Sequence, residues 1–394
     1  MINILKIRIL FADKVLATTM LVLFNIMFVP IEQGPFSPVK IVFMGICPLI
    51  FIAKKPIVTK ALILCALYWM VCYLLSLLKG EIRFSTLGFL GMHFILFVNF
   101  YTFLVRETFS LDYFTKVLRF LIIAYGMVFI GQQLCLLVGL RFMPLLNLQN
   151  QFYLSLTKLP ALSLEPSHTA RILAFAILGY WRCMEIRLGK KLSIKALFSA
   201  EHKVITILFL WTMLLMGSGT AFVAMGCLSL YFVTRTTAIY IVPLMLGLFF
   251  LGQFFELKQM DRAVSMAQAV TTGDVEEVYE TDGSGAARVI PVLNAFTKTD
   301  LAKCETWIGK KSMEIDTYAW ARKDRFIYEQ YGLIAYVISL VFIYSCVIRR
   351  IFSVETLMFI ILLGCSLANV YYIWGCFMIL ASVKYFQENY TEGE

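Results

Sequence analysis

Charge is scarce in this chain, and histidine is scarcer still. Only 15% of the 394 residues are charged, 60% are hydrophobic, and there are three histidines. A soluble domain needs more charge to cover its surface, so this composition argues against an ordinary globular protein. The sequence also lacks a Walker loop, a His-Glu-x-x-His helix and an Asp-x-Asp pair. We therefore expect no cofactor and no metal.

Cysteine occurs ten times, but without a pattern. Nine cysteines lie in or beside apolar runs, where a thiol behaves as a small buried hydrophobe. Only Cys304 lies in a long polar segment. This scatter predicts neither a disulfide framework nor a metal cluster.

Long apolar runs recur along the whole chain. In lipid, backbone polar groups need partners within the segment, so these runs are predicted to be helices. They do not alternate every second residue, which disfavours a β-barrel. We predict an all-α polytopic protein of about 12 transmembrane helices, forming a single integral membrane domain over residues 1–394. The predicted spans are 14–31, 37–53, 57–78, 87–105, 117–140, 169–184, 204–217, 220–234, 238–255, 331–348, 354–369 and 371–386.

The lysines and arginines predict the orientation. With the N-terminus in the cytoplasm and the first helix retained, 19 of the 35 fall on the inner side, 6 in short outer segments and 10 in residues 256–330. By the positive-inside rule, both termini are cytoplasmic, and the loops 141–168 and 256–330 are outside. This bias also accounts for the net charge of +10 without nucleic acid. The loop 256–330 is too long to be structureless unless it is functional, and we expect short helices in it.

The first candidate for chemistry is the turn that leads into the span 169–184. Pro166 restricts Glu165 to an extended conformation, and Ser167 is predicted to cap the following helix. With His168 and Arg171, the turn places a carboxylate, an imidazole and a guanidinium at the outer membrane boundary, where ionisable groups tend to mark function. The alternative is a charged helix start in which Glu165 pairs with Arg171 and His168 fills space.

Two further sets of residues are candidates. Small residues around Ser218 and Thr220 predict either one long helix broken at Gly217-Ser218-Gly219 or a re-entrant pair. Such a break can aim a helix end at a ligand. The alternative is a tight turn or a notch that lets helices pack closely. Arginines of the large loop suit phosphate binding, although a surface ion pair is the alternative for each. These arginines are Arg262, Arg288, Arg322 and Arg325. His93 is predicted to be packed within a span, and His202 lies on the cytoplasmic side.

Four short motifs follow one another over roughly residues 160–350. They are Glu165-Pro166-Ser167-His168, Gly217-Ser218-Gly219-Thr220, the Ser284 to Arg288 segment with Ile290-Pro291 and the later Trp307-Ile308-Gly309, and Tyr328-Glu329-Gln330-Tyr331-Gly332-Leu333-Ile334. In their order and spacing these motifs resemble the O-antigen polymerase (Wzy) family, within the O-antigen ligase/polymerase group.

The resemblance implies a GT-C-like, metal-independent glycosyltransferase of the bacterial inner membrane. It would polymerise oligosaccharide units on undecaprenyl pyrophosphate into O-antigen or capsule at the periplasmic face, with a chain-length regulator as a partner. The related ligases carry a histidine in the large outer loop, and residues 256–330 contain none, so the resemblance favours a polymerase over a ligase. We assign Glu165 as the base, with His168 as its alternative.

The remaining candidates are assigned to the substrate. Arg171 and Arg288 are the first candidates for stabilising the leaving pyrophosphate, and the three other loop arginines are the next. Ser218 and Thr220 are assigned to substrate binding. This hypothesis requires Glu165, Arg171 and Arg288 to meet at one cavity on the outer face.

Three other functions stay open. A ligase would join the glycan to a lipid acceptor, and its loss would remove all surface chains, whereas loss of a polymerase leaves single units. A transporter of polysaccharide or lipid-linked glycan would need a polar path through its helices, often with internal repeats. A membrane scaffold would leave the Glu165 to Arg171 turn without a role.

Overall fold

The computed structural model describes residues 2–26, 37–54, 57–140, 143, 158–233, 243, 265, 268, 271–273, 275–281, 283–311 and 322–390, without the side chains of 2–12, 281, 283, 284 and 288. Every regular element in these ranges is a helix. Within these ranges, three helices are long and apolar enough to cross a membrane: α3 (Lys60–Leu78), α4 (Phe84–Val105) and α5 (Leu111–Leu137). The all-α prediction is confirmed, whereas the count of about 12 spans stays a prediction.

The chain folds as two compact units. The first comprises residues 1–59, 92–232 and 370–394. Besides α5 and the second part of α4, its elements are α1 (Ile2–Asn25), α2 (Pro38–Ala53), α6 (Pro166–Leu188), α7 (Ile194–Leu197), α8 (Lys203–Leu215), α9 (Gly219–Ser229), the 3₁₀ turn η2 (Leu230–Phe232) and α17 (Tyr371–Asn389).

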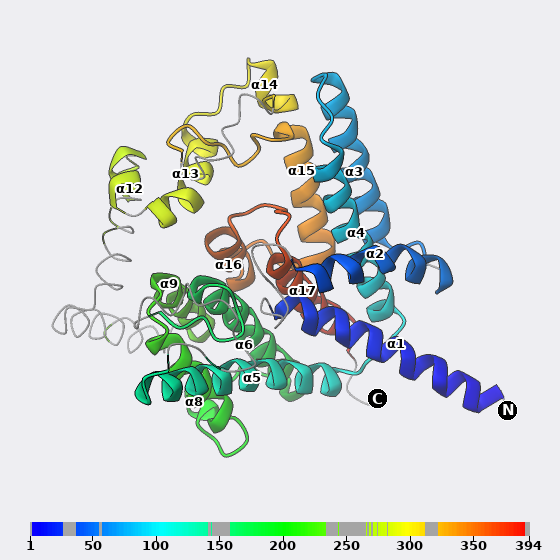
Figure 1. Ribbon diagram of the computed structural model, residues 1–394, viewed down its shortest axis with the longest axis vertical. Coiled ribbons are helices and arrows are strands. Elements are labelled where there is room, and N and C mark those ends of the chain that lie inside the picture. The colour runs from blue at the N-terminus through cyan, green and yellow to red at the C-terminus, as the bar shows by residue number, and fades with distance from the viewer. Residues whose placement is uncertain are drawn as a thin grey trace. The chain divides into compact units, whose positions relative to one another are not determined.

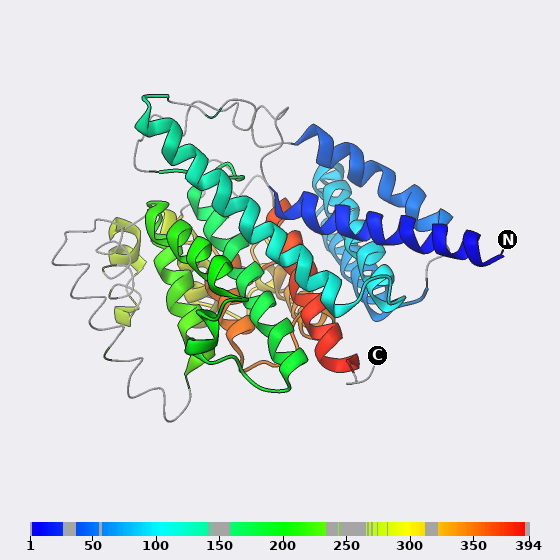
Figure 2. The same cartoon turned by 90° about the horizontal axis from the view of Figure 1, so that it is seen from below.

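Helix α6 is the centre of the first unit. It packs against α17, α5 and α9 (Figures 1 and 2). Its contact with α17 is close because Gly179 has no side chain, and a Cβ there would lie 2.8 Å from the Ile379 side chain. The buried residues run almost without interruption from Pro166 to Met184. A helix that is buried on all sides is enclosed by other helices, so it can carry functional groups into the interior.

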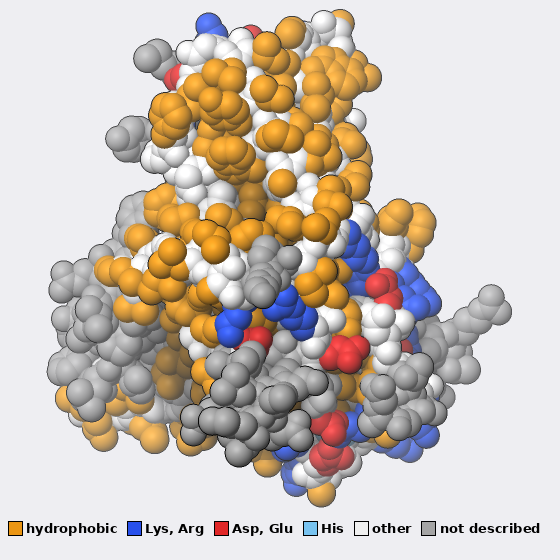
Figure 3. All heavy atoms as spheres, turned by 90° about the vertical axis from the view of Figure 1, so that its right-hand side faces the viewer, with side chains coloured by type: hydrophobic (Ala, Val, Ile, Leu, Met, Phe, Trp, Pro, Cys, Tyr) orange, Lys and Arg blue, Asp and Glu red, His pale blue; other side chains and the backbone are white. Residues whose placement is uncertain are grey.

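The second unit comprises residues 60–91 and 233–369. Its elements are α3, the first part of α4, α12 (Val275–Thr281), α13 (Gly283–Thr297), α14 (Cys304–Ile308), α15 (Gly332–Phe342), the π-helix η4 (Ile343–Val347) and α16 (Val354–Leu363). Helix α3 packs against α15 and η4. Its other face is covered by hydrophobic side chains, as Figure 3 shows from the side of α3. This exposed apolar face suits contact with lipid.

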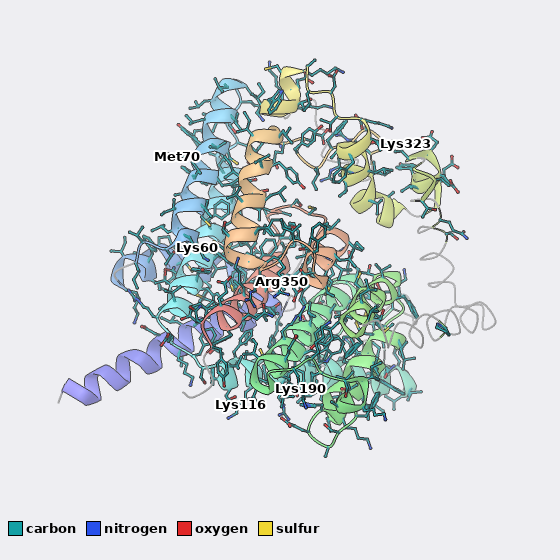
Figure 4. The ribbon with its side chains drawn as sticks, turned by 180° about the vertical axis from the view of Figure 1, so that it is seen from behind. Lys60, Met70, Lys116, Lys190, Lys323 and Arg350 are labelled. Atoms are coloured by element: carbon teal, nitrogen blue, oxygen red, sulfur yellow. The ribbon has the colours of Figure 1, made fainter. Side chains whose placement is uncertain are left out.

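The large loop is folded where the structure describes it. Helices α12 and α13 share an apolar cluster that includes Val278, Ala286 and Ile290, all fully buried. Lys323, labelled in Figure 4, ties the last part of the loop to α12 through an ion pair of 2.6 Å with Glu276. The pKa of Lys323 is raised, chiefly by this bond. The loop therefore contains helices, as predicted.

The loop returns to α15 through a close backbone contact. Gly309 and Gly332 both have positive φ angles, and a Cβ on Gly332 would lie 2.1 Å from the carbonyl oxygen of Trp307. The Lys310 amide donates to the carbonyl of Glu329 at 2.9 Å. The Glu329 carboxylate is buried, and Arg322 donates to it. We call Lys310, Arg322 and Glu329, with the two glycines, the loop knot.

Most predicted spans correspond to helices, with shifted ends. Ser110 caps α5 through its side chain, so this helix begins before the predicted residue 117. Helix α16 stops at Leu363 instead of 369 because Gly364 adopts a left-handed conformation. The predicted span 238–255 lies outside the described residues, apart from residue 243.

Candidate functional site

The turn before α6 has the backbone that Pro166 predicts. Glu165 is extended, with φ −138° and ψ 147°, and Pro166 is the first residue of the helix. The predicted cap is wrong: Glu165, not Ser167, is the N-cap residue. Pro166 takes the first helical position, where its fixed φ fits the helix and its missing N–H is not needed. The Ser167 hydroxyl instead donates to the Glu165 carboxylate at 3.2 Å. The carboxylate makes no capping bond, so it is free to act on other groups.

Arg171 lies one and a half turns into α6 and is buried, with 5% of its surface exposed. Its guanidinium donates to the hydroxyl of Tyr372 on α17, and its Cζ lies 5.3 Å from the centre of that ring. The Nε atom is also buried and has no hydrogen-bond partner among the described residues. A buried cation with an unused donor is costly, and it can stabilise an incoming anion.

Tyr372 joins Arg171 to the turn. The rings of Tyr372 and His168 lie against each other at a tilt of 31°, with their centres 4.7 Å apart. His168 Nε2 lies 3.9 Å from a carboxylate oxygen of Glu165. The four side chains thus form a continuous series from an exposed carboxylate to a buried guanidinium. We call Glu165, His168, Tyr372 and Arg171 the α6 site.

The charges of this turn are not arranged as in a simple charged helix start, in which Glu165 would pair with Arg171. Among the described residues, Glu165 contacts Ser167 and His168 and makes no ion pair with Arg171. The Glu165 side chain remains about half exposed. A simple charged helix start would have paired the two charges. The arrangement instead leaves the Glu165 carboxylate half exposed, while Arg171 is buried and bonded to Tyr372.

The helix break at Gly217 is confirmed. Helix α8 ends at Leu215, Gly217 has a φ of +68°, and α9 begins at Gly219 after an extended Ser218. Ser218 is buried and makes no capping bond through its side chain. The assignment of Ser218 and Thr220 to substrate binding stays a prediction.

The loop arginines differ in what the structure describes. Arg262 lies outside the described residues, and Arg288 is placed only by its backbone, within α13. Arg322 pairs with Glu329 and lies 3.6 Å from Asp324, as expected for an ion pair. The backbone carbonyl of Arg325 accepts a bond of 2.9 Å from Asn294. These residues belong to the second unit and the α6 site to the first, so their convergence stays a prediction.

Sequence reasoning missed the aromatic residues that begin α17 and the cation near them. Lys40, expected in an outer segment, is fully buried on α2, with its Nζ 5.1 Å from the centre of the Tyr371 ring. His93 is packed as predicted, stacked on Trp374 with ring centres 5.7 Å apart. Tyr371 and Tyr372 lie in an apolar run, which gave no signal of polar contacts. Only Lys40, an isolated cation between apolar segments, offered one.

The structure describes no metal cluster of His, Cys, Asp or Glu in the ranges given above, and all ten cysteines are free. Comparison with known proteins found no match to any family model, curated protein or solved structure.

Proposed function

We propose that this chain is a membrane glycosyltransferase that polymerises oligosaccharide repeat units carried on undecaprenyl pyrophosphate. The proposal rests on one observation above all: the α6 site holds an open carboxylate and a buried guanidinium within one series of contacts. Transfer of a sugar from a pyrophosphate carrier needs a base for the acceptor and a cation for the leaving group. The motif resemblance supplies the substrate class.

In this mechanism Glu165 takes the proton from an acceptor sugar hydroxyl, whose oxygen bonds to the anomeric carbon of the donor. The bond from that carbon to the pyrophosphate breaks, and the phosphate oxygen keeps the electron pair. Arg171 stabilises this charge, and His168 orients Glu165 or replaces it as base. Because Arg171 is buried, its contact with phosphate requires a local movement that opens a path to its guanidinium. Arg288, Arg262 and Arg325 are proposed as additional phosphate ligands, and Ser218 and Thr220 as substrate contacts. Arg322, a further candidate from the sequence, is instead assigned to its ion pair with Glu329.

The proposed setting is the bacterial inner membrane, with both termini cytoplasmic and the α6 site facing the periplasm. The product is O-antigen or capsule, and a chain-length regulator is a proposed partner. The proposed fold is GT-C-like with about 12 spans in a single membrane domain. The proposed mechanism is metal-independent, as the motif resemblance implies.

The test replaces Glu165 with Gln, which keeps the shape and removes the base. The readout is the ladder of surface glycan lengths in the source bacterium, at matched protein level. We expect chains to shorten to single units, with a loss of roughly 10²–10⁴-fold in elongation rate. A ligase would instead lose all surface glycan, and a transporter would accumulate its cargo inside.

Glu201→Gln is the matched control. The Glu201 carboxylate is about half exposed and lies 3.9 Å from a histidine, His202, so it repeats the local geometry of Glu165. By the predicted orientation it lies on the cytoplasmic side, so its loss should leave the ladder unchanged. A normal ladder in Glu165→Gln, or equal losses in both variants, would refute the assignment of Glu165 as base.

A further inference from the structure

The loop segment around α14 exposes large apolar side chains. Leu301 is 58% exposed and Trp307 is 40% exposed. The two are neighbours, because the indole Nε1 of Trp307 donates to the carbonyl of Leu301 at 2.9 Å. The polar group of this tryptophan is therefore satisfied within the protein, and its ring can leave water without losing a hydrogen bond.

Lysines surround these apolar residues. Lys303 and Lys311 are exposed on either side of α14. Residues 298–311 contain four lysines against two acidic residues, Asp300 and Glu305, and Asp300 lies 3.8 Å from Lys303. The segment thus carries excess positive charge. We call Leu301, Trp307, Lys303 and Lys311 the α14 patch.

The position of the α14 patch relative to a membrane follows from α3. This 19-residue helix is the most apolar of the three candidate spans, and Lys60, labelled in Figure 4, begins it. Its exposed leucines continue to Leu78, the last residue. Lys79 follows directly, and its Nζ donates to the carbonyls of Lys310 at 3.2 Å and Gln330 at 2.6 Å. Burial lowers the pKa of Lys79. The chain after α14 is therefore held at the level where the apolar face of α3 ends.

A second contact fixes α14 at this level. The backbone at Trp307 packs directly on Gly332, the first residue of α15, with no room for a Cβ. Figure 1 shows α14 beside the ends of α3 and α15. Since both contacts are to the backbone, the α14 patch cannot move far from the end of these helices.

We propose that the α14 patch is an interfacial anchor that binds the anionic headgroup region of the leaflet at this end of α3. Tryptophan favours the headgroup level of a bilayer. Lysines near the surface are attracted by anionic lipid, while the apolar side chains enter the boundary with the acyl chains. The anchor holds the returning loop against the membrane. This inference needs α3 to span a membrane and does not depend on the proposed enzymatic activity.

Cys304 gives a direct test, because it is the one cysteine classed as exposed, and it lies at the start of α14. The full chain is reconstituted in bilayers of phosphatidylcholine with or without phosphatidylglycerol, and Cys304 is labelled with an environment-sensitive fluorophore. Cys304→Ser measures background labelling. We expect blue-shifted emission that is quenched by a nitroxide placed at the lipid headgroup, more strongly in the anionic bilayer.

Two pairs of substitutions separate the contributions. Lys303→Glu with Lys311→Glu should reduce the quenching by about twofold or more in the anionic bilayer at low salt, and little in phosphatidylcholine alone. Leu301→Ser with Trp307→Ser should move the emission to that of the dye in water in both bilayers. Phe352→Ser is the control, because Phe352 is 98% exposed but lies beyond the opposite end of α15.

The charge pair keeps the test informative if the apolar pair disturbs α14, since the lysine side chains are exposed. Aqueous emission of the unaltered chain in every bilayer would overturn the proposal. Shielding that occurs in native membranes but not in either pure bilayer would also overturn it, because a protein partner would then cover the patch.

Discussion

The α6 site and the loop knot each contain a glutamate and an arginine, but arrange them differently. In the loop knot, Arg322 pairs directly with the buried carboxylate of Glu329, and Lys310 Nζ lies 3.7 Å from the same carboxylate. In the α6 site, Glu165 and Arg171 are six residues apart and do not pair within the described residues. Paired charges stabilise a fold, whereas separated charges remain available to a ligand. This difference, more than the residue types, favours the α6 site as the place of chemistry.

The largest expected effect follows from Arg171. Arg171→Lys keeps the positive charge but loses the planar fork, and we expect elongation to slow by about 10²-fold or more. Tyr372→Phe removes only the acceptor for Arg171 and should cost about tenfold. The measurement is the rate of chain growth on a lipid-linked repeat, with folding checked by thermal unfolding. Unchanged rates in both variants would place the chemistry elsewhere.

The next effect is on stability, through the loop knot. Gly332→Ala combines a positive φ with a contact of 2.1 Å between the new Cβ and the carbonyl of Trp307. We expect a loss of about 3 kcal/mol or more, because the backbone must shift. Gly80→Ala is the matched control: its φ is +67°, but no atom lies within 4 Å of the new Cβ. It should cost about 1–2 kcal/mol. Chemical denaturation of the purified chain measures both, and equal losses would show that Gly332 is not packed as described.

Arg322→Gln provides the counterpart to the Arg171 variant. It removes the main partner of a buried carboxylate, Glu329, while Lys310 partly compensates. We expect a loss of about 2 kcal/mol in stability, with the rate of elongation per folded molecule nearly unchanged. If Arg322→Gln instead lowered the rate at full stability, Arg322 would act on substrate, and the contrast between the two regions would fail.

The smallest effect concerns His202, which, like His168 of the α6 site, lies 3.9 Å from a glutamate. Burial lowers the pKa of His202 below its ordinary value of 6.5, although Glu201 opposes the shift. The folded protein therefore keeps His202 neutral at a pH where the unfolded chain binds a proton. This contribution to stability is present above about pH 6.5 and is lost as the pH falls through the lowered pKa, by at most about 1.4 kcal/mol per pH unit.

His202→Gln checks this pH dependence. Tyr180 bonds to Nδ1 of His202 at 2.6 Å, and glutamine retains a polar group there without titrating. As the pH is lowered from 7.5 to 5, the midpoint temperature of thermal unfolding should fall less steeply in the variant than in the unaltered chain. Parallel curves would show that His202 does not titrate differently on folding.

The sequence predicted the helices well because their signal is local. An apolar run between charged or turn residues defines a helix whatever it packs against, so the predicted span 57–78 differs from α3 only at its start. The ends were less accurate where a single cap decides them, as with Ser110 and Gly364. Such caps compete with neighbouring residues of similar propensity.

The α6 site was predictable only on its own helix. Glu165, His168 and Arg171 follow each other in the sequence, and their grouping was visible. Tyr372 lies 201 residues from Arg171 and sits in an apolar run, where a buried tyrosine looks like any other aromatic residue. Its role depends on the packing of α17 against α6, which no local pattern contains.

Consecutive tyrosines at the start of α17 touch two different cations. Tyr371 lies against Lys40 of α2, and Tyr372 lies against Arg171 of α6. Neighbouring residues on a helix point about 100° apart, so α17 contacts cations on two of its faces. Gly375, one turn later, leaves no room between α17 and the carbonyl of Phe24 on α1. Lys40 and Arg171 are therefore connected through the backbone of α17, which close packing against α1 holds in place.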